Sequence, residues 1–269
     1  MVEVAENPSV PSILSGTFKR QIFAIQDYTL LSIESIADIF TPPQYWTDTL
    51  EQMDLIGVGS LSIVAIAALF IGGVMVLNTA SQFERFGMTA LTGDAVSLAL
   101  VRELGPTITA ILVAGRNASG IASELGSMVV TEQVDAMRAL GVDPIRKLMT
   151  PRVLATIFVL PLLVGIADFL GLLGGFLISY FTLHVSSVQF WTRAVDALAL
   201  GDLVMGIVAK PIVYAIIVST IGCYQGLRVR GGTQGVGRAT TSAVVTSSLT
   251  VLVVDLFLTK LFLHIFSLG

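Results

Sequence analysis

Long apolar stretches separated by short polar segments set the pattern of the whole chain. A transmembrane helix needs about 20 mostly apolar residues. Five segments meet this requirement: 55–77, 95–114, 153–180, 203–224 and 243–266. The pattern therefore predicts an all-α membrane protein with five transmembrane helices, which together form a membrane domain over residues 55–269.

An amphipathic pattern precedes the first of these segments, within residues 13–40. Apolar side chains recur there at helical spacing among charged and amide residues: Leu14, Phe18, Ile22, Ile25, Ile33, Ile36 and Phe40. A helix of this kind lies in the membrane interface rather than crossing the bilayer, and Thr41-Pro42-Pro43 ends it. We therefore predict a cytoplasmic and interfacial helix region over residues 1–54. A soluble helix packed on a partner is the alternative.

Composition agrees with a membrane protein. Apolar residues make up 54% of the 269 residues and charged residues 13%, which is about half the charged share of a soluble domain. One soluble core could not bury so much apolar surface. Cys223 is the only cysteine, and His184 and His264 lack the spacing of metal ligands. We expect neither a disulfide within the chain, nor a metal, nor a cofactor.

Lysine and arginine gather in alternate connections, and cytoplasmic loops carry the excess of both. Segment 115–152 holds five of them, segment 225–240 holds three, and Lys19 and Arg20 lie in the N-terminal region. The opposite loops hold only Arg85 and Arg193. With five crossings, we expect a cytoplasmic N-terminus and a C-terminus on the outer side.

The segment 115–152 is the largest predicted cytoplasmic loop, and it contains a second amphipathic pattern. Val134, Met137 and Leu140 fall on one helical face, with Glu132, Asp135 and Arg138 elsewhere, and Gly141-Val142-Asp143-Pro144 ends the pattern. A short cytoplasmic helix of this kind suits docking on a soluble partner. An interfacial helix without a partner is the alternative.

Motifs of energy-converting enzymes are missing from the sequence. No GxxxxGK[ST] loop occurs, and the glycine-rich stretch 231–238 lacks the required lysine. No hydrolase motif occurs either. We therefore expect a chain that is not an enzyme and that depends on a partner for energy. Two alternatives from other classes stay open. An intramembrane lipid-modifying enzyme would need a nucleophile or metal cluster, and none is visible in the sequence. An ion-coupled secondary transporter would usually show an internal repeat, and the sequence shows none.

Charged residues inside the apolar segments are the strongest functional signal. Each costs several kcal/mol in hydrocarbon, roughly 3, unless it is paired or hydrated. With a rise of about 1.5 Å per residue, all five fall in one layer in the outer half of the bilayer: Arg102, Glu103, Asp168, Lys210 and Asp255. Similar depth predicts an intramembrane ion pair between Lys210 and Asp255. It would serve either as a structural pin or as part of a conformational switch.

Glycines cluster in two of the apolar segments. They are Gly72 and Gly73 in the first, and Gly171, Gly174 and Gly175 in the third. Small residues let transmembrane helices approach closely, so we expect these glycines to act in helix packing.

Several short motifs together resemble the MlaE/YrbE family of permeases, which serve Mce-type lipid transport systems. The likeness covers about residues 50–266. The matching stretches include Arg102-Glu103-Leu104-Gly105-Pro106, Ala114-Gly115-Arg116, Glu124-Leu125-Gly126, Thr131-Glu132-Gln133, Gly141-Val142-Asp143-Pro144 and Arg238-Ala239-Thr240-Thr241. Asn117-Ala118 departs from the pattern, because smaller residues are expected after the Gly-Arg pair.

The resemblance implies a homodimer in a bacterial inner membrane, with the C-terminus in the periplasm. Each subunit would have five transmembrane helices, an N-terminal interfacial helix and a cytoplasmic coupling helix. A cytoplasmic ABC ATPase dimer would bind ATP-Mg, often with a small STAS-domain regulator. A hexamer of MCE-domain proteins would sit on the outer side, and phospholipid or a related lipid would be the cargo. No nucleic acid is expected as a partner.

The resemblance also suggests roles for individual residues. Arg102 and Glu103 would lie near the lipid headgroup, and Met75, Asn78 and Phe86 would line the pocket. The helix near 131–140 would transmit ATPase movement through five residues: Glu132, Gln133, Asp135, Met137 and Arg138.

Overall fold

The computed structural model describes residues 10–39, 41–42, 44–88, 91–183 and 185–265, with the side chains of residues 10–21 and 263 outside that description. Five helical spans in it are long and apolar enough to cross a membrane: Trp46–Glu84, Thr92–Val130, Ile145–Leu183, Leu200–Leu227 and Gly232–Phe262. No strand occurs within the described ranges. The predicted all-α fold with five membrane helices is confirmed.

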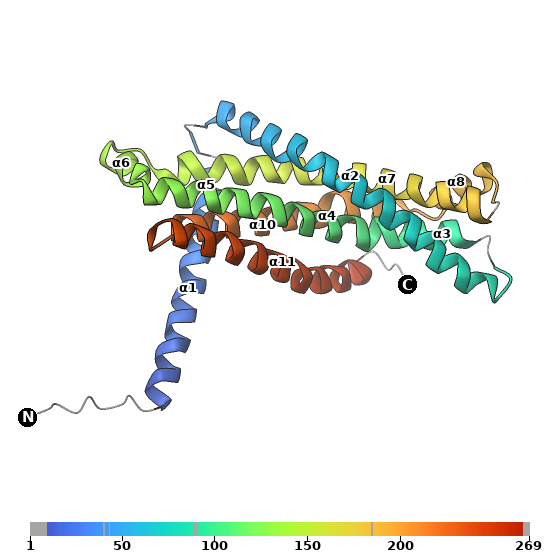
Figure 1. Cartoon of the computed structure of the whole chain (residues 1–269), viewed down its shortest axis with the longest axis horizontal. Helices are drawn as coiled ribbons and strands as arrows, with labels where there is room; N and C mark the ends of the chain where they lie inside the picture. Colours follow the sequence, from blue (N-terminus) through green and yellow to red (C-terminus); the bar gives the residue numbers. More distant parts are fainter. Residues whose placement is uncertain (1–9, 40, 43, 89–90, 184, 266–269) are drawn as a thin grey trace, which may run out of the picture.

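Several membrane helices are built from α-helical segments joined by π-helical turns, which are labelled η. In chain order the elements are α1 (Val10–Asp38), α2 (Trp46–Glu84), α3 (Thr92–Ala99), η2 (Leu100–Leu104), α4 (Gly105–Val113), η3 (Ala114–Ala118), α5 (Ser119–Val130), α6 (Gln133–Ala139), η4 (Ile145–Met149), α7 (Thr150–Leu183), α8 (Ser187–Asp196), α9 (Leu200–Leu203), η5 (Val204–Ala209), α10 (Lys210–Leu227) and α11 (Gly232–Ile265). Figure 1 shows the long helices running side by side in one elongated bundle.

The helices are longer than the apolar segments that predict them. A span of 39 residues, such as Trp46–Glu84, measures about 58 Å, whereas the hydrocarbon core is about 30 Å thick. The predicted boundary at residue 54/55 therefore falls inside α2. The segment 115–152, predicted as a loop, is mostly helical, because backbone hydrogen bonding continues beyond the apolar residues. Only 131–132 and 140–144 separate α5, α6 and the start of the third span.

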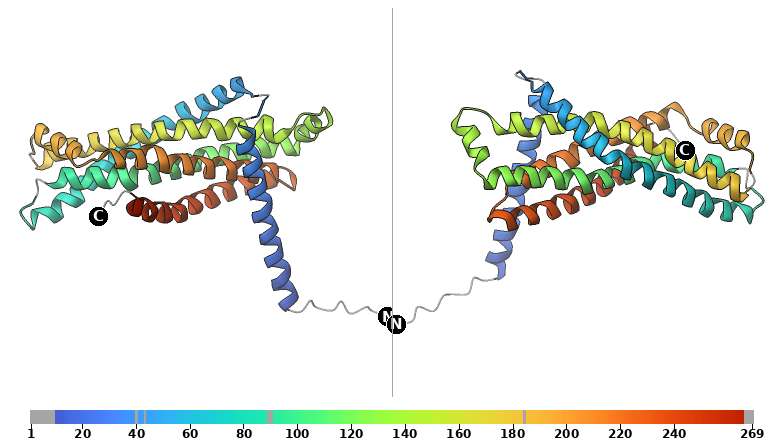
Figure 2. Two further views of the ribbon diagram at one scale, coloured as in Figure 1. Left: turned by 180° about the vertical axis from the view of Figure 1, so that it is seen from behind. Right: turned by 45° about the horizontal axis from the view of Figure 1, so that its top comes forward.

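Helix α1 leaves the bundle at a steep angle to its long axis (Figures 1 and 2). Its second half is tied to the bundle by the Tyr28 hydroxyl, 2.8 Å from that of Thr220, and by an ion pair of 2.7 Å between Asp38 and Arg146. Among its described side chains, the large exposed apolar ones are Ile22, Phe23, Ile25, Leu30 and Ile33. This geometry fits the predicted interfacial helix. The predicted apolar positions 14, 18 and 40 lie outside the described side chains.

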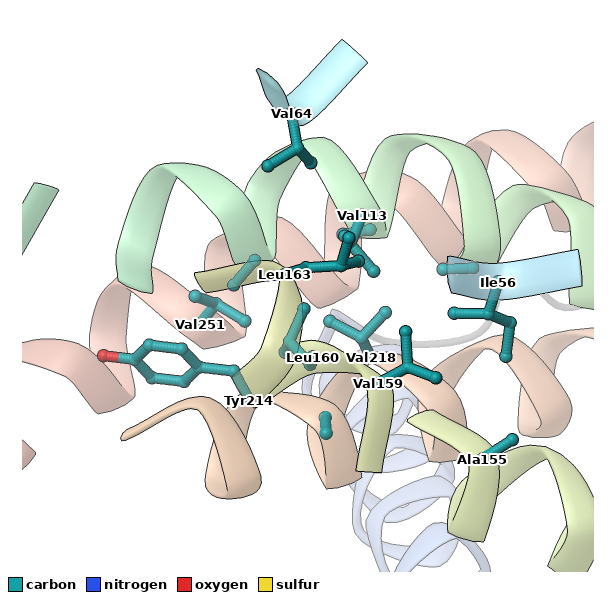
Figure 3. Packing of buried hydrophobic residues seen from close by; sticks show 14 of the residues in the cluster. Ile56, Val64, Val113, Ala155, Val159, Leu160, Leu163, Tyr214, Val218 and Val251 are labelled. Carbon is teal, nitrogen blue, oxygen red and sulfur yellow. The ribbon is translucent and has the colours of Figure 1, made fainter. Parts of the chain in front are cut away.

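Helix α7 lies at the centre of the bundle and packs against α2, α4 and α10. Its Leu160 and Leu163 are buried among aliphatic side chains from these neighbours and from α11, as Figure 3 shows; those labelled include Ile56, Val64, Val113, Val218 and, from α11, Val251. The faces turned away from this core expose large apolar side chains such as Phe70 and Phe169. A bilayer accepts such surfaces, because lipid is as apolar as the side chains.

The predicted glycine packing occurs between α2 and α7. A Cβ atom on Gly72 would lie 1.8 Å from the carbonyl oxygen of Gly171, and one on Gly174 would lie 2.0 Å from that of Leu69. The two backbones are therefore in direct contact, which only glycine allows at these positions.

Helix α8, after the third span, is not among the predicted elements. The Ser186 hydroxyl caps it by accepting the Gln189 backbone N–H at 3.2 Å. Phe190 and Ala194 are buried against α3, where Gly93 leaves room for them. The helix is too short and too polar to register as a membrane segment.

Candidate functional site

Lys210 is the centre of a buried polar cluster at the start of α10. Its side chain is fully buried, and its Nζ lies 2.8 Å from Glu103 Oε2 and 3.0 Å from Asp255 Oδ1. The structure thus places Lys210 and Asp255 within ion-pair distance, as the sequence predicts. Glu103 is a second carboxylate partner, which the sequence did not assign to Lys210.

The backbone of the second membrane helix supplies a further acceptor. Pro106 has no N–H and cannot donate to the Arg102 carbonyl one turn earlier. The Lys210 ammonium donates to that carbonyl instead, at 2.8 Å. The turns η2 and η5 also touch here, since a Cβ on Gly206 would lie 1.9 Å from the Val101 oxygen. Proline, glycine and two π-helical turns together open the space for the ammonium group.

Hydroxyl groups complete the cluster. The Thr259 hydroxyl accepts from Lys210 at 2.9 Å and donates to Glu103 Oε1 at 3.0 Å, and the Tyr214 hydroxyl donates to the Asp255 carboxylate. Sequence reasoning missed both hydroxyls, because neutral residues give little signal in an apolar segment. The available signal was spacing: Tyr214 and Thr259 each follow a charged residue by four positions and so share its helical face.

Arg102 points to a different partner. Its Nε donates to Asp202 Oδ1 at 2.6 Å, and Asp202, which is fully buried, accepts the Ala199 backbone N–H at 3.0 Å through its other oxygen. The Arg102 side chain remains 26% exposed. Asp202 was missed because it lies just outside the apolar segment 203–224. An acidic residue at the third position of a helix is a capping signal that could have found it.

Asp168 lies beside this cluster without joining its hydrogen bonds. Its carboxyl fills the space of the missing side chain at Gly105, where a Cβ would be 1.7 Å from Oδ1. The five predicted membrane charges therefore gather in one region of the bundle, from four spans. In the part of the chain that the structure describes, no group of three or more His, Cys, Asp or Glu residues could hold a metal ion.

The cluster opens on a recess of about 520 Å³ along one face of α11. Its lining combines charged, hydroxyl and leucine side chains: Glu103, Leu252, Asp255, Leu256, Thr259 and Lys260. Such a lining suits an amphipathic molecule with a charged end and an apolar body.

The three pocket residues predicted on and after the first span do not reach this recess within one chain. Met75 packs against a core of α3, α7 and α8 side chains. Asn78 is exposed on α2, and Phe86 is 74% exposed in the turn that follows α2. Their contact with lipid stays a prediction.

The proposed coupling helix is α6, which is shorter than its predicted pattern. Val134 is buried and Met137 partly buried, whereas Asp135 and Arg138 form an exposed ion pair of 2.9 Å. Leu140 is 82% exposed and not on the packed face, because the helix ends at Ala139 and Gly141, at φ +75°, turns the chain. Glu132 precedes the helix in the left-handed region, at φ +59°.

Known proteins match nearly the whole membrane domain. The family described as Permease MlaE matches residues 49–261. A probable ABC transporter permease from Rickettsia typhi is 41% identical over 234 residues, 87% of this chain and 90% of its own. One from Synechocystis is 41% identical over 220 residues, covering 80% and 81%. Protein TRIGALACTOSYLDIACYLGLYCEROL 1, chloroplastic, from Arabidopsis thaliana is 38% identical over 218 residues, covering 81% and 62%.

Proposed function

Because the chain belongs to the MlaE family of permeases and is the permease of an ABC transporter, we propose that its cargo is phospholipid or a related lipid. The observation that carries the proposal is the recess beside Lys210, which puts ionised groups and exposed leucines side by side along one face of α11. The Arabidopsis relative supports it, since its name is that of a lipid, trigalactosyldiacylglycerol.

The lining of the recess suggests how a lipid would be held. Lys260 contributes a cation at its edge, and Leu252 and Leu256 contribute apolar walls. An ammonium group binds a phosphate as a point charge. Arg102 lies next to the lining residue Glu103 but outside the lining, and what its pairing with Asp202 leaves free of its guanidinium would offer further donors. The headgroup would face these cations while the acyl chains follow the leucines.

The proposal includes a second copy of the chain and several partners. Helix α11 presents exposed apolar side chains along the recess, among them Leu249, Val253 and Phe257, which favours closure of the recess by a homodimer. A cytoplasmic ATPase dimer would bind ATP-Mg and drive the cycle. A STAS-domain regulator and an outer MCE hexamer complete the assembly by family resemblance, in a bacterial inner membrane.

Orientation follows from the ends of the bundle. Helix α6 and the turn between α10 and α11 lie at the end of the bundle nearer α1, opposite α8 (Figure 1). The basic residues of the predicted cytoplasmic segments belong to that end, where Arg146 and Arg228 pair with Asp38 and Asp27 of α1. This arrangement supports a cytoplasmic N-terminus and a periplasmic C-terminus.

We expect charge reversal on α6 to uncouple the permease from its ATPase. The double change Glu132→Lys and Asp135→Lys alters exposed side chains at the tip of the bundle, so folding should persist. ATPase co-purification should fall about tenfold, as expected for lost charge complementarity at an interface. Glu84→Lys, an exposed charge reversal at the other end of the bundle, is the matched control. Full recovery of an active complex from the double variant would refute the coupling role.

Lipid retention tests the recess. Lys260→Gln removes an exposed cation and should lower co-purifying phospholipid about tenfold, the effect of one charge-assisted contact. Arg102→Ala should do the same, and combining it with Asp202→Asn avoids an unpaired buried carboxylate. Lipid mass spectrometry of the purified dimer measures both. Unchanged lipid in all variants would exclude the recess, and transport without the ATPase would favour a secondary transporter or a lipid-modifying enzyme.

A further inference from the structure

A polar notch separate from the recess lies between α2 and the C-terminal half of the second span, at η3 and α5. Its volume is about 200 Å³, and its lining consists of Gln52, Leu55, Ile56, Arg116, Asn117, Gly120, Ile121 and Glu124. None of these residues lines the recess beside Lys210. The notch is smaller than a drug-sized pocket of roughly 300 Å³, so it suits a headgroup rather than acyl chains.

Two buried polar atoms in the notch have no hydrogen-bond partner. Asn117 is only 6% exposed, and its Nδ2 donor is unpaired, while its Oδ1 accepts from the Ser60 hydroxyl at 3.4 Å. The Oε1 acceptor of Gln52 is also unpaired. Buried donors and acceptors nearly always find a partner, so these two atoms are available to a water, an ion or a ligand. Asn117 is also the residue that departs from the family pattern.

Arg116 brings a cation to the same notch. Among the described residues it forms no ion pair, and its recorded contact is a hydrogen bond of 3.4 Å to Ser60. Its guanidinium lies across Gly59, where a Cβ would be 1.9 Å from Nη1. Glu124, the one carboxylate of the lining, is already paired with Arg152 at 2.7 Å. Among the described residues, the notch therefore combines a cation that no carboxylate pairs with and an unpaired amide donor.

In the proposed orientation, the notch would lie near the headgroups of the cytoplasmic leaflet. Gln52 and Leu55 flank the start of the first apolar segment, at its cytoplasmic end in the proposed orientation. We propose that Arg116 and Asn117 bind the phosphate of a lipid headgroup in the cytoplasmic leaflet, at a site separate from the recess. Arg116 would meet the charge, and the Asn117 amide would donate to an ester oxygen. The inference rests on the proposed function, which supplies the orientation and the lipid cargo.

Photocrosslinking of the full-length chain tests the site. The chain is placed in nanodiscs of phosphate-free galactolipid containing phosphatidylglycerol with a diazirine on its headgroup, and the labelled peptides are mapped. A phosphate-free diacylglycerol probe with the same diazirine is the comparison. We expect the phosphate probe to label residues 52–56 and 116–121. Arg116→Gln should reduce this labelling about tenfold, the effect of one lost charge-assisted contact.

Gly59→Ala tests the same site without changing any notch residue. The new methyl group would displace the guanidinium, and alanine is favoured over glycine in a helix, so the variant should fold. It should lose labelling as Arg116→Gln does. Gly115→Ala, whose Cβ would meet nothing within 4 Å, and Arg85→Gln at the other end of α2 should label as wild type.

Three results would overturn the proposal. They are equal labelling by the two probes, wild-type labelling of both Arg116→Gln and Gly59→Ala, and displacement of the label by inorganic phosphate, which would show a free-anion site. Labelling of residues 252–260 reports on the recess independently. If it persists while the notch is unlabelled, the notch proposal fails and the lipid permease function stands.

Discussion

Replacing Lys210 by methionine should destabilise the protein by about 3–5 kcal/mol, the cost of removing one partner from a buried ion pair. Lys210 is fully buried and holds Glu103, Asp255 and the Arg102 carbonyl together. Methionine has a similar length and leaves little cavity, so the loss comes from two carboxylates left without their cation. Denaturant unfolding of the purified protein in detergent measures the change.

Removing one acidic partner should cost less stability than removing the lysine. Asp255→Asn leaves Lys210 paired with Glu103, so we expect a smaller loss than for Lys210→Met. The double variant Lys210→Met with Asp255→Asn should be milder than the sum of the two single losses, because contacting residues are energetically coupled. Lys147→Met, which breaks a half-exposed pair with Asp48, should cost at most about 1 kcal/mol.

Adding Glu103→Gln to the double variant, so that no carboxylate is left without its cation, separates a structural pin from a switch. If the cluster only pins the helices, transport returns along with stability when all three charges are removed. If the pair changes partners during the cycle, stability returns and transport does not. Strictly additive losses from the single and double variants would show that the two side chains are not coupled.

Gly174→Ala should separate α2 from α7 and destabilise the protein by about 1–3 kcal/mol or more, the cost of overpacking a tight contact. The added methyl would lie 2.0 Å from the Leu69 carbonyl oxygen. That atom belongs to the backbone of a membrane helix and cannot rotate away as a side chain would. Gly72→Ala should behave alike, because its methyl would lie 1.8 Å from the Gly171 oxygen.

Gly237→Ala is the control for this prediction. It lies in α11 with nothing within 4 Å of the added Cβ, so helix propensity should make it neutral or stabilising by up to about 1 kcal/mol. Thermal unfolding monitored by size-exclusion chromatography compares the three variants. Wild-type stability of both Gly72→Ala and Gly174→Ala would mean that the α2–α7 contact is looser than the structure shows.

The sequence by itself determined the number of membrane helices, the separate N-terminal helix and a short helix near 131–140, and it predicted that the intramembrane charges share one layer. The bilayer imposes these features on local composition: hydrocarbon demands apolar runs of fixed length, and it makes each buried charge conspicuous. The packing role of the glycines in the first and third segments could also be predicted, because only small residues let two membrane helices come into close contact.

Beyond the predicted pair of Lys210 and Asp255, only the tertiary structure decided which charges meet. Depth alone could not show that Glu103 shares Lys210 with Asp255, or that the neighbouring Arg102 turns to Asp202. Partner choice depends on how each helix is rotated about its axis. The π-helical turns before Gly105 and Lys210 each accommodate an extra residue, which shifts the direction of every side chain that follows. Hydropathy carries no signal for that rotation, because it is fixed by packing against helices that are distant in the sequence.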